Sequence, residues 1–153
     1  MIRLMASTMV ALMGSMASAG AADAPAAPIT LMSVKIGVTD FQRSTDFYVK
    51  YFGMKQGAKY NAAEQGIDWP TPGQGSNIIL VNDPSGKVIK LAPGGGWIML
   101  KVPDAKKIAK AMTDAGEKGV EAPIEIKQYQ TVVVTAHDPD GNTVEMLQVG
   151  PSQ

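Results

Sequence analysis

A segment of this chain occurs twice at constant spacing, since 83–91 is matched by 138–146. Each copy carries a turn signal rich in Asp, Pro and Gly. The turn signals separate β-like runs, at 77–81 and 88–91 in the first copy and at 131–136 and 143–149 in the second. A repeat of this length predicts two similar halves packed together, with any site where the halves face each other.

A second pair of matched segments extends the repeat, since 33–40 resembles 97–104. Both segments alternate in side-chain type and end in an Asp, whose carboxylate can accept the free N–H groups of a first helical turn. Helix-like stretches follow and close at Gly53 and Gly116, because glycine suits the left-handed position after a helix. Each half is therefore predicted as a strand, a helix and two or three further strands. This is an α+β fold of two βαβββ modules, at about 31–92 and 96–149.

The two first strands have two different faces, because side chains alternate along a strand. One face is uniformly aliphatic and should pack on the helices. The other face carries Ser33 and Lys35 in the first module, and Trp97 and Met99 in the second. Such a mixed face suits either the lining of a cavity or a half-exposed sheet, and the alternation leaves both open.

Residues 1–19 are expected to be a secretory signal peptide. A positive Arg3, a mostly apolar stretch and the small-residue pattern Ala17-Ser18-Ala19 predict a mature start near Gly20. The Ala/Pro-rich segment 20–30 is expected to be a flexible lead-in, and 31–150 to form one domain. The expected location is periplasmic or secreted. The chain has no Cys, so neither a lipoprotein anchor nor a disulfide is expected.

The charges of the chain balance, with 14 Lys and Arg against 14 Asp and Glu. Binding to nucleic acid or to an anionic membrane through overall charge needs a basic excess. We therefore expect no nucleic-acid partner, and no membrane partner once the signal segment has been removed.

Two longer patterns carry a resemblance to a known family. The segment 38–54, which opens Val-Thr-Asp-Phe-Gln-Arg and closes Tyr-Phe-Gly-Met, resembles the opening motif of the glyoxalase/bleomycin-resistance/dioxygenase superfamily, also called vicinal oxygen chelate (VOC) proteins. The segment 137–147, His-Asp-Pro-Asp-Gly-Asn-Thr-Val-Glu-Met-Leu, resembles its closing motif. The resemblance covers about 31–149. It implies two βαβββ modules that form a curved mixed sheet around a cup.

The resemblance also implies where a metal would be held. Metal-dependent members place a His on the first strand of each module and a Glu on the last strand. Here Ser33 and Trp97 stand at the first-strand positions, while Glu145 and, through the repeat, Lys90 stand at the last-strand positions. An enzyme of this type needs about three protein ligands, and only Glu145 can serve. His137 with Glu145 is the weak alternative, so no cofactor is expected.

We therefore expect a protein that binds a small aromatic or planar molecule without a catalytic metal, by analogy with bleomycin-resistance proteins. No catalytic residue is assigned. The expected ligand-binding residues are Ser33, Lys35, Lys90, Trp97, Met99 and Glu145. Lys90 and Glu145 should approach each other, within one chain or across a homodimer. The Lys90 ammonium would then supply the positive charge that a metal ion provides in metal-dependent members.

Two alternatives stay open at this point. One is a metal-dependent glyoxalase-type lyase or dioxygenase whose divalent metal has unusual ligands. The other is an interaction protein whose cup has collapsed. A long loop expected at 60–75, which contains Trp69, is either a lid over the cup or a solvent loop.

Overall fold

The computed structural model describes residues 31–87 and 90–150. The signal peptide expected at 1–19 and the lead-in expected at 20–30 lie outside the described residues. No helix among the described residues is long and apolar enough to cross a membrane.

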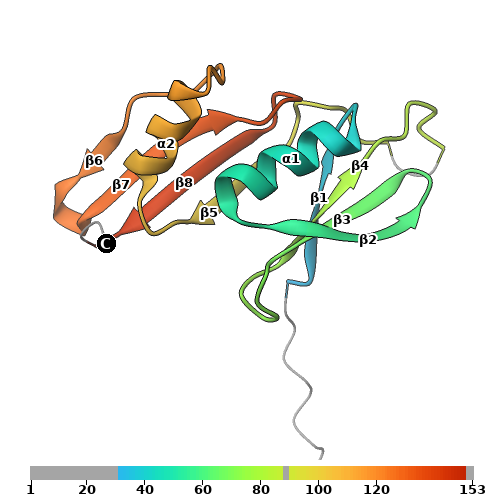
Figure 1. The fold of residues 1–153 in the computed structure, drawn as a ribbon, viewed down its shortest axis with the longest axis horizontal. Helices are drawn as coiled ribbons and strands as arrows, with labels where there is room; N and C mark the ends of the chain where they lie inside the picture. The colour runs from blue at the N-terminus through green and yellow to red at the C-terminus, as the bar shows by residue number, and fades with distance from the viewer. Residues whose placement is uncertain (1–30, 88–89, 151–153) are drawn as a thin grey trace, which may run out of the picture.

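The described chain forms two modules of the same order, strand, helix and three strands (Figure 1). The first module contains β1 (Ser33–Gly37), α1 (Phe41–Phe52), β2 (Lys55–Asn61), β3 (Glu64–Asp68) and β4 (Asn77–Val81). The second contains β5 (Trp97–Lys101), α2 (Ala105–Asp114), β6 (Ile124–Ile126), a short 3-10 turn (Lys127–Tyr129), β7 (Thr131–His137) and β8 (Thr143–Val149). The α+β fold of two βαβββ modules is confirmed.

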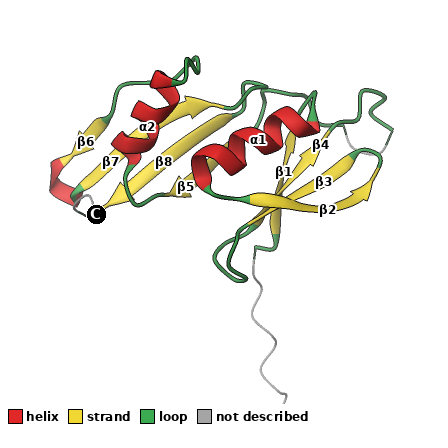
Figure 2. Cartoon of the chain, in the orientation of Figure 1, coloured by secondary structure: helices red, strands yellow, loops and turns green. Residues whose placement is uncertain are grey.

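Each module has its own four-stranded mixed sheet, called sheet 1 and sheet 2 below. The strand orders are β1-β4-β3-β2 in sheet 1 and β5-β8-β7-β6 in sheet 2. In both sheets the first strand of the module lies parallel to the last strand, and the other pairs are antiparallel. The secondary-structure colouring of Figure 2 shows the two sheets, the α-helix that follows the first strand of each, and the short 3-10 turn between β6 and β7.

The strand register corrects one part of the sequence prediction. Lys35 pairs with Ile79 in sheet 1, as Met99 pairs with Glu145 in sheet 2. Ile79, and not Lys90, therefore occupies the last-strand position that corresponds to Glu145.

The repeated turn is the source of that error. The Asp-Pro-Asp-Gly turn joins β7 to β8, whereas the Asp-Pro-Ser-Gly turn comes after β4, which is already the last strand of its module. The two copies are alike in sequence because both are tight turns, but they do not hold equivalent places. Of the strand expected at 88–91, residues 88–89 lie outside the described residues, and Lys90 and Leu91 belong to no strand.

The helices begin and end where their signals predict. Asp40 accepts a hydrogen bond from the backbone N of Arg43 at 3.0 Å, and Asp104 accepts one from the backbone N of Lys107 at 2.9 Å. Gly53 follows α1 with a φ of 64°, which a residue with a side chain rarely adopts. Three aromatic side chains of α1 enter one continuous core that also contains Met112 of α2, namely Phe47, Tyr48 and Tyr51.

The β7–β8 turn holds the second module against the first through hydrogen bonds. Asp140 Oδ1 accepts hydrogen bonds from Thr39 N at 3.0 Å, Thr39 Oγ1 at 2.5 Å and Arg43 Nη2 at 2.8 Å. Its Oδ2 accepts one from Ser44 Oγ at 2.9 Å. Because Thr39, Arg43 and Ser44 surround the start of α1, a single carboxylate of the second module holds the N-terminus of the first module's helix.

Two further residues of the same turn complete this inter-module clamp, defined here as Asp138, Asp140 and Asn142. Tyr48 Oη donates to Asp138 Oδ2 at 3.1 Å. Asn142 Nδ2 donates to the carbonyl of Gly37 at 2.9 Å, and Asn142 is fully buried. Buried polar groups are stabilising only when they are paired, and these are. The clamp therefore fixes how the two sheets sit relative to each other.

Candidate functional site

Three of the residues expected in the site lie together on the face of sheet 2 that no helix covers. Trp97 and Met99 project from the edge strand β5, and Glu145 projects from the neighbouring strand β8. The Trp97 indole N–H donates to Glu145 Oε2 at 3.2 Å. The side chains of Trp97 and Met99 remain 69% and 58% exposed. This is an exposed apolar surface beside a carboxylate, a composition that suits contact with a ligand.

A cavity of about 520 Å³ opens beside these residues, between β5 and the beginnings of β1 and β4. Its apolar walls are formed by Leu31, Val34, Trp69, Ile78, Trp97 and Met99. The volume lies within the range of small-molecule sites, about 300–1,000 Å³. The cavity brings together both tryptophans of the chain.

The loop that carries Trp69 is shorter than the sequence suggested. The first part of the loop expected at 60–75 belongs to β2, β3 and the turn between them, and the irregular segment that remains is 69–76. Trp69 is fixed in place, since its indole N–H donates to the carbonyl of Ser76 at 3.2 Å. A Cβ added at Gly75 would lie 2.9 Å from Trp69 Nε1, so Gly75 leaves room for the ring. Trp69 is thus part of the cavity wall.

The uncovered face of sheet 1 carries a charged pair that sequence reasoning missed. Lys35 Nζ donates to Glu64 Oε1, and Asn61 Nδ2 donates to Glu64 Oε2 at 2.7 Å. Glu64 is only 9% exposed. The hydrogen bonds from Lys35 and then from Asn61 lower the pKa of Glu64, although burial acts in the opposite direction. Lys35 on a mixed strand face was a signal that a buried carboxylate partner was needed, but nothing in the sequence pointed to Glu64.

The register on which the prediction of a Lys90–Glu145 pair rested is wrong, while an approach of the two residues across a homodimer stays a prediction. Lys90 is exposed in the connection between the modules. No ion pair between Lys90 and Glu145 occurs among the described residues. Ser33 is half-buried at the start of β1 and pairs with Asn77, so it lies in sheet 1, away from the partners of Glu145.

The residues at the family's four metal positions do not fit a metal ion. These positions hold Ser33, Ile79, Trp97 and Glu145 in the observed register. Neither an isoleucine side chain nor an indole N–H offers a lone pair, and Glu145 already accepts from Trp97. Within 31–87 and 90–150, no three His, Cys, Asp or Glu side chains gather as a metal would require.

His137, the weak alternative ligand, lies on β7 opposite Thr143. Its Nδ1 is buried without a hydrogen-bond partner. A Cβ on Gly119 would lie 2.7 Å from the Cδ2 of the ring, so the loop after α2 presses against the imidazole. His137 lies on the same face of sheet 2 as Glu145, but together they provide only two of the roughly three ligands that a metal site of this type needs.

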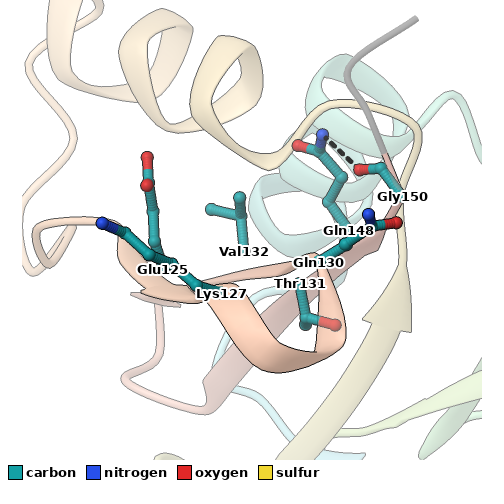
Figure 3. A pocket seen from close by; sticks show the side chains of 7 residues that line it. All are labelled: Glu125, Lys127, Gln130, Thr131, Val132, Gln148 and Gly150. Atoms are coloured by element: carbon teal, nitrogen blue, oxygen red, sulfur yellow. Dashed lines mark hydrogen bonds between the residues drawn. The ribbon is translucent and has the colours of Figure 1, made fainter.

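A second hollow, of about 530 Å³, lies at the far end of sheet 2. Figure 3 shows Glu125, Val132 and Gln148 projecting to the same side of the sheet, as their cross-strand pairing requires, while Thr131 points away. Gln148 is held by Ala105 N, which donates to its Oε1 at 3.0 Å. The lining of this second hollow contains none of the residues expected in the site.

Comparison with known proteins agrees with the fold. Residues 30–146 match the model of the Glyoxalase/Bleomycin resistance protein/Dioxygenase superfamily. A probable lactoylglutathione lyase of Synechocystis is 30% identical over 123 residues, which are 77% of this chain and 94% of that protein. A putative lactoylglutathione lyase of Brassica oleracea is 28% identical over 75% of this chain, which spans only 43% of that longer relative.

A solved structure gives a second comparison. TnmS3, an antibiotic-binding protein from Streptomyces, matches with a TM-score of 0.62 and 20% identity, over 81% of this chain and 98% of that chain. At this identity the likeness concerns the fold alone. Together with the family match over most of the described residues, these findings show that the chain belongs to the glyoxalase/bleomycin resistance protein/dioxygenase superfamily.

Proposed function

We propose that this protein binds a small aromatic or planar molecule in the cavity between β5 and the start of β1, without a catalytic metal. The observation that carries the proposal is the meeting of Trp69, Trp97 and Met99 around one cavity of about 520 Å³. Indole rings offer broad faces for stacking, and a thioether adapts its shape to a ligand. Glu145, beside Trp97, supplies a hydrogen-bond acceptor that can orient a polar group of the ligand.

Tryptophan fluorescence tests this proposal directly. The chain has two Trp residues and both line the cavity, so the intrinsic signal reports on this site alone. Phenazine, a neutral planar aromatic, serves as the first probe, followed by a panel of planar aromatic antibiotics. We expect saturable quenching by at least one of these compounds.

Two variants locate the binding. Trp97→Ala should weaken it by about 1–3 kcal/mol, the cost of losing an aromatic anchor. Tyr129→Ala is the matched control, because Tyr129 is a similarly exposed aromatic in the turn before β7 and does not line the cavity. Equal affinity in Trp97→Ala and the unchanged protein would remove this cavity as the binding site.

A metal-dependent lyase is the second candidate, because the relative with 30% identity is named a probable lactoylglutathione lyase. The misfit of Ser33, Ile79 and Trp97 as ligands speaks against it. Lactoylglutathione lyase activity should be assayed with and without added Ni²⁺, Zn²⁺ or Mg²⁺, together with elemental analysis of the purified protein. We expect no activity and no stoichiometric metal. Lyase activity that depends on one bound metal per chain, and that is lost with the metal in Glu145→Gln, would establish this second candidate.

We also propose that a second copy of the chain covers the open face of sheet 2. On that face Ile124, Ile126 and Val149 are exposed in addition to Trp97 and Met99, and uncovered apolar faces of this extent usually mark an interface. Light scattering should show a homodimer, and Ile126→Lys should shift it to monomer. A monomer at all concentrations would refute the homodimer and leave the open face of sheet 2 accessible to the ligand.

Export is the last part of the proposal. It is supported by the apolar start and the Ala17-Ser18-Ala19 pattern. Mass spectrometry of the protein recovered from the native host should find an N-terminus near Gly20, in the periplasm or the medium. An intact Met1 in the cytoplasm would refute export.

A further inference from the structure

A groove of about 340 Å³ lies between α1 and α2. Figure 1 shows the two helices side by side, one from each module. The floor of the groove is apolar and consists of Tyr51, Pro103, Ile108 and Ala111. The Tyr51 hydroxyl donates to Glu117 Oε1 at 2.7 Å. Because the hydroxyl is already paired, the ring of Tyr51 serves the groove as an apolar wall.

Two ammonium groups flank this floor, one from each helix. Lys50 Nζ lies 4.7 Å from the centroid of the Tyr51 ring, so it sits directly over the apolar wall. Lys107, in the first turn of α2, also lines the groove. The groove also contains Asp104, whose carboxylate is engaged by the backbone N of Lys107 at 2.9 Å. Among the lining residues two ammonium groups thus face one carboxylate, while the carboxylate of Glu117 lies just beyond the Tyr51 hydroxyl.

Lys107 differs from the other lysines of α2. Lys106 is paired with Glu125, and Lys110 with Asp114. The Lys107 ammonium has no ion pair or hydrogen bond within the described part of the chain. Lys107 is exposed like Lys106 and Lys110, but it lies, without such a partner among the described residues, beside an apolar hollow.

We propose that this interhelical groove is a second binding site, for a small organic anion with an apolar body. The body would lie on Tyr51 and Ile108, and the carboxylate would pair with Lys107 and Lys50. Sites of this kind combine an apolar lining with a few polar groups that fix orientation. Since the groove draws on both modules, the bound anion adds contacts between them and stabilises the native state by mass action.

The site is independent of the tryptophan cavity, and the experiment keeps the two apart. Cyclohexanecarboxylate is the probe, because it is apolar and anionic but not aromatic. Its neutral analogue cyclohexanecarboxamide is the matched ligand. Binding is followed by ¹H–¹⁵N chemical-shift changes on the protein, which report both the affinity and the residues affected.

We expect shifts centred on 50–51 and 103–111, with the amide analogue binding about 5- to 10-fold more weakly than the acid. Lys107→Gln should weaken the binding of the acid by a similar factor, and so should Lys50→Gln. Lys110→Gln is the control, since it removes a neighbouring lysine that is paired outside the groove. Trp97→Ala should leave this binding unchanged.

Three outcomes would overturn the proposal. They are equal binding of the acid and the amide, unchanged affinity in both Lys107→Gln and Lys50→Gln, and shifts confined to β5 and 69–76. The last outcome would mean that the anion enters the tryptophan cavity.

Discussion

Replacing Asp140 by Asn tests whether the β7–β8 turn holds the two modules together. The carboxylate of Asp140 is 1% exposed and accepts from Thr39, Arg43 and Ser44. Asn keeps the shape and one acceptor oxygen but removes the charge. Its amide nitrogen would face the Ser44 hydroxyl, which must then turn to accept instead of donating. The change therefore weakens every contact that Asp140 makes across this junction without creating a cavity.

The cost can be estimated from these contacts. A hydrogen bond to a charged group contributes about 1.5–3 kcal/mol and a neutral one about 1 kcal/mol, so each charged bond that becomes neutral loses about 0.5–2 kcal/mol. The low end applies here, because three of the donors share Oδ1. Arg43 is 50% exposed, and solvent screening reduces its share. We expect a loss of about 2 kcal/mol in the free energy of unfolding. With an m-value of about 1.5 kcal/mol/M, the urea midpoint should fall by about 1–1.5 M.

The assay is urea unfolding followed in parallel by far-UV circular dichroism and tryptophan fluorescence. Asp114→Asn is the matched control, because its carboxylate belongs to an exposed i,i+4 pair with Lys110 and should cost about 0.3–0.5 kcal/mol. If Asp140→Asn costs no more than Asp114→Asn, the carboxylate does not hold the modules together, and the reasoning fails.

Three further predictions concern the same junction. Burial acts to raise the pKa of Asp140, but hydrogen bonds from Thr39 and Ser44 and the charge of Arg43 lower it overall. Its contribution should therefore be complete above about pH 5 and lost as the pH falls below about 4, so the urea midpoints of Asp140→Asn and the unchanged protein should converge in acid. Tyr48→Phe, which leaves Asp138 short of a donor, should cost about 1–2 kcal/mol by urea unfolding, and a change within error would show that this bond contributes nothing. Gly96→Ala should cost about 1–3 kcal/mol in the same assay, because the added Cβ would lie 2.8 Å from the buried Asn142 Oδ1. An unchanged urea midpoint would mean that the junction rearranges to accommodate the methyl group.

The parts of the fold that local sequence determines were predictable. Asp40 and Asp104 cap their helices as expected, and the alternation in β5 places Ile98 and Leu100 in the core and Trp97 on the open face. Caps and alternation depend on neighbours within a few residues, so a linear pattern contains all the information that they need.

The pairing of strands was not predictable in the same way. Register depends on which strands meet in space, and the similarity of two Asp-Pro turns suggested an alignment that the sheets do not follow. Ile79, a plain aliphatic residue, carried no signal that it would stand beside Lys35. Likewise, Glu64 meets Lys35 only because β3 and β1 flank the same strand β4. A charged residue on a mixed face predicts a partner, but only the topology identifies it.

The closing motif shows why the resemblance predicts the fold better than the chemistry. Of its polar residues, Asp138, Asp140 and Asn142 all bond across the junction to the first module or within their own turn. Glu145 alone reaches the candidate site. Most of the motif therefore specifies how two modules join, which any binder or enzyme built this way requires. What the site can bind depends on residues outside the motif, chiefly Trp69 and Trp97, and these must be read from the structure of each chain.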